Sequence, residues 1–252
     1  MHLLYDTENP KAVELHSFLA ERINLKDGDE NICIVLGGDG FMLRSIRSHY
    51  RAETVFLGLN CGAVGFLLNE VPAERDAVVE SIQEEKFSIR SFPRIEMACT
   101  DLSGQSHSAA AVNDIYLERM TGQTVHFRLQ INEITVLEKL VCDGIILSTA
   151  LGSTAYNFSA SGAVCHPNLG IISVTPICPH SPRLGSVILP VESTIELEAL
   201  SPESRQAQAV ADGVVFQNVV RMSVTCAAEG VQLAFLHGHD YTAAMFQKVL
   251  LV

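Results

Sequence analysis

The 252-residue chain contains no tryptophan, only 6% aromatic residues and no surplus of positive charge. Its 17 Lys and Arg residues stand against 29 Asp and Glu, which gives a formal net charge of −12. A protein that binds a nucleic-acid backbone needs clustered basic residues to neutralise the phosphates, and the sequence has no basic run. We therefore expect no nucleic acid among its partners.

Long apolar runs are also missing, although hydrophobic residues make up 48% of the chain. No uncharged apolar stretch reaches the roughly 18 residues that a membrane helix needs. No cationic segment leads into an apolar one at the start, as it would in an export signal. We expect a cytoplasmic protein with no membrane partner, large enough for one large domain or two modest ones.

Metal-site and disulfide patterns are absent as well. The seven cysteines are an odd number, lie far apart and never form Cys-x-x-Cys, which favours reduced, buried thiols. His237-Gly238-His239, Cys165-His166 and Cys178-Pro179-His180 each supply at most part of a ligand set. We predict no structural metal.

The first third of the chain alternates short apolar runs with helical patterns, an order typical of a Rossmann-like α/β domain with a parallel sheet. Parallel sheets of this kind carry ligands at the carboxyl ends of their strands. The expected elements are strands at 2–5, 32–36 and 54–59 and helices at 10–25, 41–50 and 72–86.

The remainder consists of strand-length runs separated by turn signals, which predicts a mainly antiparallel, β-rich domain. Strands are expected at 95–100, 110–117, 125–131, 134–137, 171–175, 187–189, 193–200, 207–210, 214–216, 221–226 and 231–236. A last helix, Tyr241–Leu251 with Asp240 as its N-cap, has an apolar face that we expect to return to the first domain. The predicted domains are therefore 1–88 together with 238–252, and 89–237.

The motif Gly37-Gly38-Asp39-Gly40 stands between a predicted strand and a predicted helix. Glycines at such a turn let backbone N–H groups approach an anion, and the helix N-terminus adds partial positive charge. A phosphate site and a plain turn in which Asp39 caps the helix are equally favoured by these residues alone. The spacing matches neither the Gly-x-Gly-x-x-Gly motif nor a P-loop.

A second glycine-containing stretch, Asn60 to Leu67, follows the next predicted strand. Phe66 in this stretch could stack on a purine. Taken alone, an ordinary core phenylalanine beneath a loop is the better interpretation.

The polar pair Asn113-Asp114 interrupts an otherwise apolar predicted strand. Two adjacent side chains face opposite sides of a sheet unless the strand bends or ends there. Ribose hydroxyls could satisfy a buried pair, although a strand end or bulge is preferred for an isolated case.

The longest informative stretch runs from Cys142 to Gly162, where a strand leads into many small hydroxyl residues and Tyr156. Hydroxyl groups beside an aromatic ring suit hydrogen bonding and stacking against a nucleotide. We favour this interpretation over a polar turn before a helix. No Gly-x-Ser-x-Gly nucleophile motif is present.

These four stretches, in this order, resemble the NAD kinase family of the bacterial type. The matching segments are Gly37-Gly38-Asp39-Gly40, Asn60 to Leu67, Asn113-Asp114, and Asp143-Gly144 followed by Gly152-Ser153-Thr154-Ala155-Tyr156. Gly-Gly-Asp-Gly is shared with lipid kinases and related to the phosphofructokinases, whereas Gly-Ser-Thr-Ala-Tyr is not. Asp114 stands where the family has Glu, Ala150-Leu151 where Pro-Thr is usual, and Gly185-Ser186 where Arg-Pro is usual.

The resemblance implies an enzyme that phosphorylates the adenosine ribose 2′-hydroxyl of NAD to give NADP. The donor is ATP or polyphosphate, with Mg²⁺ or another divalent metal, and the assembly is a homodimer or homotetramer. Asp39 is implied as the catalytic residue and Gly37, Gly38 and Gly40 as the phosphate loop. The implied NAD-binding residues are Asp39, Gly40, Phe66, Asn113, Asp114, Asp143, Thr154, Ala155, Tyr156 and Ser159.

Two other functions stay open from the sequence. A lipid kinase of the diacylglycerol type, or a sugar kinase, would share the Gly-Gly-Asp-Gly motif but would not need the hydroxyl-rich segment that ends at Tyr156. A non-catalytic NAD(P)-binding regulator would keep the pocket, although the presence of Asp39 argues against it.

Overall fold

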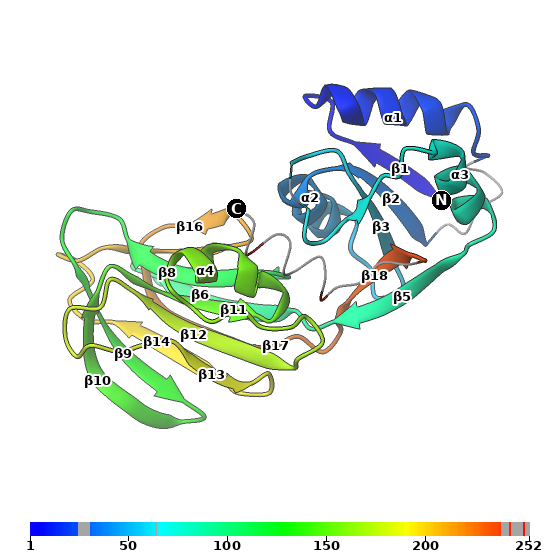
Figure 1. Cartoon of the computed structure of the whole chain (residues 1–252). Coiled ribbons are helices and arrows are strands. Elements are labelled where there is room, and N and C mark those ends of the chain that lie inside the picture. The colour runs from blue at the N-terminus through cyan, green and yellow to red at the C-terminus, as the bar shows by residue number, and fades with distance from the viewer. Residues whose placement is uncertain (25–30, 64, 238–241, 243–248, 250–252) are drawn as a thin grey trace. The chain divides into compact units, whose positions relative to one another are not determined.

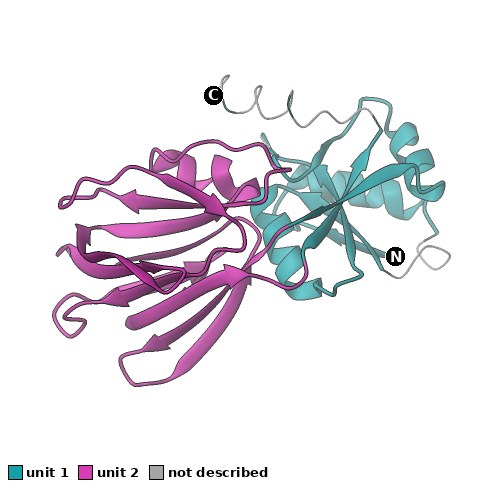
Figure 2. Cartoon of the chain, turned by 90° about the horizontal axis from the view of Figure 1, so that it is seen from below, with its two compact units in different colours: residues 1–92, 230–252 teal, residues 93–229 magenta. Residues whose placement is uncertain are grey.

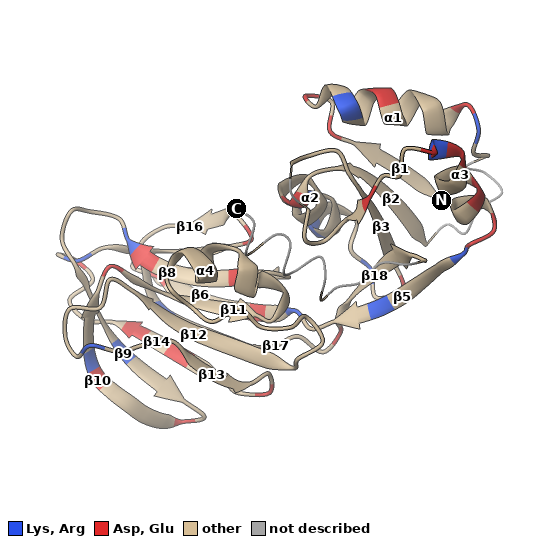
Figure 3. Ribbon diagram, in the orientation of Figure 1, with Lys and Arg blue, Asp and Glu red and all other residues tan. Residues whose placement is uncertain are grey.

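The computed structural model describes residues 1–24, 31–63, 65–237, 242 and 249 (Figure 1). The chain divides into two compact units, residues 1–92 with 230–252, and residues 93–229 (Figure 2). Asp and Glu are distributed along both units, with Lys and Arg among them (Figure 3). None of the helices formed by the described residues is long and apolar enough to span a membrane.

Unit 1 is built on a mainly parallel sheet with the strand order β1-β2-β3-β18-β5, and a short strand, β4, pairs with β3. The first four strands of this order run parallel, whereas β5 is antiparallel to β18. The bounds are β1 His2–Tyr5, β2 Ile32–Gly37, β3 Val55–Asn60, β4 Asn69–Glu70, β5 Phe87–Phe92 and β18 Val231–Leu236. All residues of β2 and β3 are buried, as expected for central strands covered on both faces.

The described residues form three helices that cover this sheet: α1 Pro10–Ala20, α2 Asp39–His49 and α3 Arg75–Gln83. All three were predicted; α1 and α3 are shorter than expected, whereas α2 begins two residues earlier and ends one residue earlier than predicted. Asn9 caps α1 by accepting the N–H groups of Lys11 and Ala12. One cluster joins buried side chains of α1 and α3 to one face of the sheet. Met42 and Ile46 of α2 are buried outside that cluster, so α2 lies on the opposite face.

The strand at 231–236 was expected in the second domain but belongs to the sheet of unit 1. It lies between β3 and β5, and four of its six residues are buried. The Asn69 amide fixes this arrangement, since it donates to Gly58 O and Ala234 O and accepts from Leu236 N. The unit boundaries therefore fall at 92 and 230 rather than at 88 and 238, because β5 and β18 complete the first sheet.

Unit 2 consists of two six-stranded antiparallel sheets, in the orders β10-β9-β14-β17-β6-β7 and β13-β12-β11-β8-β15-β16. One contiguous apolar cluster takes side chains from both sheets and forms the core between them. The first sheet contains β6 Ile95–Asp101, β7 Ser106–Ala111, β9 Val125–Ile131, β10 Ile134–Cys142, β14 Ile195–Ala199 and β17 Val219–Cys226. The second contains β8 Asp114–Arg119, β11 Gly144–Thr149, β12 Ile171–Ile177, β13 Val187–Pro190, β15 Ala207–Ala211 and β16 Val214–Phe216. The predicted antiparallel, β-rich domain is confirmed.

The predicted strand at 110–117 is wrong as a single element. β7 ends at Ala111 and belongs to one sheet, whereas β8 begins at Asp114 and belongs to the other. The chain crosses between the sheets at residues 112–113, which an apolar run does not reveal, because both strands are buried on one face. The predicted last helix, Tyr241–Leu251 with Asp240 as N-cap, falls almost wholly outside the described residues.

Candidate active site

The glycine-rich turn of unit 1 connects the end of β2 to the start of α2. Gly38 is the N-cap of α2 and has an extended backbone. A Cβ on Gly37 would lie 2.9 Å from Phe41, so packing requires glycine there, whereas a Cβ on Gly38 would meet nothing within 4 Å. Gly40 is exposed in the first turn of the helix. The turn thus leaves open backbone at a helix N-terminus, the arrangement that suits a phosphate group.

Asp39 is the first residue of α2 and not its cap, so the interpretation of Asp39 as a capping residue is wrong. Its carboxylate reaches instead to the loop after β3, where Oδ2 accepts Phe66 N at 2.8 Å and Oδ1 accepts Leu67 N at 2.9 Å. Each carboxylate oxygen has further acceptor capacity after one such bond. Asp39 therefore anchors the loop that follows β3.

The loop after β3 is held from inside by Asn60. The Asn60 amide donates to Glu70 Oε1 at 3.1 Å, and Asn60 Oδ1 accepts Gly62 N at 2.9 Å. Phe66 is only half-buried, unlike an ordinary core phenylalanine. Part of its ring is therefore accessible for stacking.

The site residues of unit 2 gather where three neighbouring strands of the second sheet meet. Because β8 runs antiparallel to β11 and β15, its first residue Asp114 pairs with Ser148 near the end of β11, and Ile115 pairs with Ala211 at the end of β15. Asp212 follows directly. The structure thus brings Asn113 and Asp114 close to Ser148, the first hydroxyl residue of the stretch 142–162.

The side chains of Asp114 and Asn113 carry buried polar groups, and Asn113 Oδ1 lacks a hydrogen-bond partner among the described residues. Asp114 is 7% exposed. Its burial, reinforced by the negative charge of Asp212, raises the pKa of the Asp114 carboxyl to about 7 from an ordinary 3.8. Asn113 Oδ1 is buried and has no hydrogen-bond partner within the described parts of the chain.

The elevated pKa of Asp114 predicts a pH-dependent stability effect. The folded protein keeps the Asp114 proton up to about pH 7, whereas the unfolded chain loses it near 3.8. The favourable contribution of the protonated Asp114 carboxyl to folding is therefore present below about pH 4. It is lost as pH rises to 7, which lowers the free energy of unfolding by about 4 kcal/mol. Asp114→Asn should be more stable than the native chain above pH 7, with a gain that shrinks toward pH 5 in urea denaturation.

The exposed carboxylate Asp76 provides the control for this prediction. Its side chain is 89% exposed, so Asp76→Asn should give no gain that grows with pH. An equal gain for Asp114→Asn at pH 5 and pH 8 would contradict the assignment of a buried, protonated carboxyl.

Three hydroxyl groups of the stretch 142–162, those of Ser148, Thr149 and Ser153, bond to backbone carbonyl groups within the fold. Thr149 Oγ1 donates to Val112 O at 2.6 Å, and Ser153 Oγ donates to Ala150 O at 2.6 Å. Buried Asn157 donates to Ser153 O and accepts from Thr175 Oγ1. An irregular backbone below the surface needs such partners. Among the predicted ligand residues, Thr154, Ala155 and Tyr156 are half-buried and Ser159 is exposed.

Tyr156 opens the short helix α4, Tyr156–Ser159, which follows the 3₁₀ turn η1, Leu151–Thr154, and is seen beside β8 and β11 in Figure 1. Its ring packs edge-on against Tyr116 of β8, with centroids 5.0 Å apart and planes at 79°. Burial raises the pKa of the Tyr156 hydroxyl, and the negative charge of Glu118 is the next cause. The contact with Tyr116 places the Tyr156 ring against β8.

Asp143 lies at the opposite end of β11 from the Asn113-Asp114 pair. Five residue steps separate it from Ser148, about 17 Å along a strand. Asp143 Oδ1 makes an ion pair of 3.0 Å with Arg119 Nε. The structure does not bring Asp143 to Asp114, and only an extended ligand could contact both.

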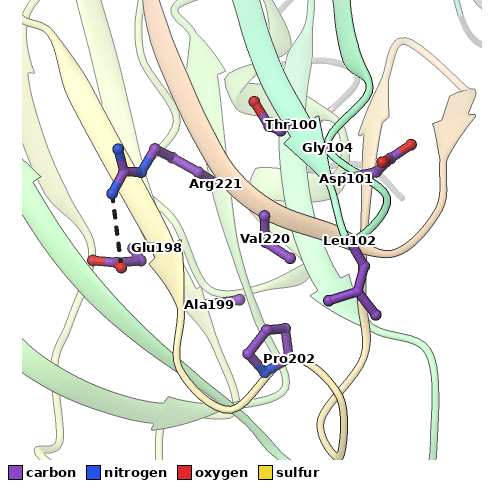
Figure 4. Close-up of a pocket in the computed structure, with 9 residues that line it drawn as sticks. All are labelled: Thr100, Asp101, Leu102, Gly104, Glu198, Ala199, Pro202, Val220 and Arg221. Atoms are coloured by element: carbon purple, nitrogen blue, oxygen red, sulfur yellow. Dashed lines mark ion pairs between the residues drawn. The ribbon is translucent and has the colours of Figure 1, made fainter.

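Other features of the described residues do not form part of this site. No group of three or more His, Cys, Asp or Glu in the described ranges is placed to hold a metal ion. All seven cysteines are free, and five are buried. A hollow of about 500 Å³ on the other sheet of unit 2 contains the ion pair of Glu198 with Arg221 but none of the predicted site residues (Figure 4).

Sequence reasoning assigned no role to Asp212, although its side chain contacts the Asn113-Asp114 backbone. The available signal was Asp212-Gly213, a dipeptide typical of tight hairpin turns. That signal predicts the turn but not the direction of the side chain.

Comparison with known proteins places the chain in a family. Residues 112–231 match the ATP-NAD kinase C-terminal domain. An NAD kinase of Rickettsia conorii is 34% identical over 214 residues, which cover 84% of this chain and 82% of the relative. Yeast NADH kinase complexed with NADH has a similar structure, with a TM-score of 0.84, 21% identity and coverage of 99% of this chain and 87% of that one. An NAD kinase from Archaeoglobus fulgidus in complex with ATP also has a similar structure, with a TM-score of 0.79 and 23% identity. The match covers 100% of this chain and 98% of that one. The chain belongs to the NAD kinase family.

Proposed function

We propose that this chain transfers a phosphoryl group from ATP to the adenosine ribose 2′-hydroxyl of NAD and so makes NADP. It is a phosphotransferase with an alcohol group as acceptor. The observation that carries the proposal is the pair at the start of β8, where the unsatisfied amide oxygen of Asn113 adjoins the buried carboxyl of Asp114. An adenosine offers an amino group and ribose hydroxyls, which are the partners that this pair lacks.

Unit 2 supplies most of the proposed contacts with NAD, the phosphoryl acceptor. Asn113 takes the adenine amino group, with Tyr156 stacking on the adenosine and Thr154 and Ser159 at its edge. Asp114 takes ribose hydroxyls. Asp143 and Ala155 take the nicotinamide end, and the strand-length separation of Asp143 from Asp114 suits a dinucleotide.

Unit 1 supplies the groups for phosphoryl transfer. The open backbone at Gly38, between Gly37 and exposed Gly40, binds phosphate at the N-terminus of α2. Asp39 orients the 2′-hydroxyl and accepts its proton, and the half-buried ring of Phe66 is a second aromatic contact for the adenine. Positioning and charge neutralisation are the main requirements of this reaction, so covalent participation by the chain is unnecessary.

The donor is ATP or polyphosphate, and the divalent metal, Mg²⁺ or another, comes with it as part of the substrate. Mg²⁺ is commonly held by substrate phosphates, water and only one or two carboxylates. When bound, the metal neutralises charge on the transferred phosphate.

We propose a cytoplasmic homodimer or homotetramer without nucleic-acid or membrane partners. The net charge of −12 and the seven free thiols support this setting. The resemblance to NAD kinases implies that the nicotinamide end of the site is contacted across a subunit boundary. Phe158 on α4 is 47% exposed next to Tyr156, which provides apolar surface for such a contact.

One incubation tests the function. The chain is mixed with NAD, ATP and Mg²⁺, and NADP is read out with an NADP-specific dehydrogenase. Formation of NADP supports the proposal. Tight NAD binding with no NADP above background would favour a non-catalytic regulator, and phosphorylation of diacylglycerol instead would favour a lipid kinase.

Tyr156 provides a prediction on substrate specificity. Tyr156→Ala removes the ring that is expected to cover the adenosine, so KM for NAD should rise about tenfold or more, since stacking on a base is worth about 1–3 kcal/mol. KM for ATP should change much less. Tyr156→Phe keeps the ring and should retain most of the affinity for NAD. Equal increases in both Michaelis constants would contradict this assignment.

A further inference from the structure

Asp212 occupies the two-residue turn between β15 and β16. Asp212 and Gly213 both have positive φ, 42° and 84°, as in the hairpin turns that favour Asp-Gly. The turn accounts for glycine at the second position and tolerates aspartate at the first. It does not require a carboxylate, since asparagine suits the same conformation at least as well.

The Asp212 carboxylate is used elsewhere, at the corner where the chain crosses from one sheet to the other. Oδ2 accepts Val112 N at 2.6 Å, and Oδ1 accepts Asn113 N at 3.1 Å and Asp114 N at 3.3 Å. A corner between sheets lacks ladder partners for its N–H groups, and buried N–H groups need an acceptor. One side chain thus satisfies three consecutive N–H groups.

The carbonyl groups of residues 112 and 113 accept hydrogen bonds from Thr149, at the end of β11. Thr149 Oγ1 donates to Val112 O at 2.6 Å, and Thr149 N donates to Asn113 O at 2.9 Å. The backbone that presents Asn113 and Asp114 is therefore fixed between Asp212 and the end of β11. Loss of either side would release the pair.

The Asp212 carboxylate also acts on Asp114 by its charge. Burial is the larger cause of the raised pKa of Asp114, and Asp212 is the second. The other titratable groups that face Asp114 are the hydroxyls of Tyr116 on β8 and Tyr156 on α4, whose pKa values Asp114 helps to raise. Both hydroxyls stay neutral near pH 7, so Asp212 supplies the charge that acts on Asp114 there.

We propose that Asp212 is a positioning residue of the acceptor site, which fixes the backbone that presents Asn113 and Asp114 and makes NAD binding depend on pH through Asp114. The inference rests on the proposed function, because it takes Asp114 as the ribose contact. Ionised Asp114 accepts charge-assisted hydrogen bonds from ribose hydroxyls, which are stronger than those to the neutral acid. Affinity for NAD should therefore increase as pH rises through neutrality.

The test measures NAD binding to the full chain by calorimetry, without ATP, from pH 5.5 to 8.5. The native chain should show a dissociation constant that falls with pH and levels off above neutrality. In Asp212→Asn the midpoint should move to lower pH by about one unit, as expected when one neighbouring charge is removed. The plateau affinity should also weaken about tenfold, because an amide cannot accept all three N–H groups.

Two further variants separate the effect of the Asp212 charge from the effect of the position of its carboxylate. Asp212→Glu keeps the charge but moves it by one methylene, so it should weaken binding with little change in the midpoint. Asp114→Asn should abolish the pH step. Urea denaturation of each variant shows whether it is folded, and Asp212→Glu still tests the positioning role if Asp212→Asn does not fold.

The outcomes distinguish the inference from the function on which it rests. If the native chain binds no NAD at any pH, the proposed function fails and the inference fails with it. If the native chain binds NAD but Asp212→Asn keeps the native midpoint and plateau, or merely loses stability, Asp212 is only a turn residue and the inference alone is overturned.

Discussion

Replacing Asp39 by Asn should lower kcat by about 10²–10⁴-fold, the usual contribution of a positioned general base. A ribose hydroxyl is a weak nucleophile near neutral pH, and a carboxylate within hydrogen-bond distance can orient it and accept its proton as the new P–O bond forms. A carboxylate beside a triphosphate is repelled by it, so its presence at a phosphate-binding turn needs a catalytic or structural reason.

The structure supplies a structural reason that the experiment has to separate from the catalytic one. Asp39 accepts one N–H from Phe66 and one from Leu67. Asn keeps one acceptor and turns an N–H₂ group toward the other N–H, which should cost about 1–3 kcal/mol of stability in this loop. A loss of activity alone would therefore not identify a base.

The decisive comparison is between turnover and binding. If Asp39 acts in the transition state, Asp39→Asn should lower kcat at saturating substrate while the dissociation constant for NAD changes only a few-fold. Asp76→Asn is the matched control, because Asp76 is also an acidic residue in the first turn of a helix but is exposed. It should retain normal turnover. Near-normal kcat in Asp39→Asn, with lost NAD affinity or stability, would make Asp39 an anchor of the loop and not a base.

Local sequence patterns predicted where strands begin and end better than they predicted which strands pair with each other. Alternation and turn signals located 125–131 and 231–236 with their correct bounds. The second of these strands was nevertheless assigned to the wrong domain. Its place beside β3 depends on hydrogen bonds from Asn69, which lies far away in the sequence. Strand pairing over such separations leaves no signal in a single sequence.

In the candidate site, the sequence indicated which residue types are present but not what each side chain contacts. The apolar run at 110–117 concealed a crossing between sheets, and the polar pair inside it was the only local sign of the break. The hydroxyl-rich segment suggested ligand contacts at Thr154, Tyr156 and Ser159, whereas the hydroxyl groups of buried Thr149 and Ser153 bond to backbone carbonyls. Hydroxyl groups serve a ligand and an irregular backbone equally well, so only the fold separates these roles.

Gly152→Ala should weaken NAD binding by more than tenfold and lower the free energy of unfolding by about 1–3 kcal/mol or more, as overpacking of a close contact typically does. An added Cβ would lie 2.6 Å from Asn113 Cα and closer still to the Asn113 carbonyl. Backbone lies on both sides of this contact, so no side chain can rotate away to make room.

The expected loss of affinity follows from what would have to move. Either η1 shifts and carries Tyr156 with it, or the corner at Asn113 shifts and breaks the bond from Thr149 N to Asn113 O. Both responses displace a group proposed to contact the adenosine. Gly122→Ala is the matched control in the same unit, because a Cβ there would meet nothing within 4 Å, and it should bind NAD normally. Calorimetry and urea denaturation of the two variants give the comparison. Native affinity in a folded Gly152→Ala variant would show that the close approach of η1 to Asn113 does not shape the acceptor site.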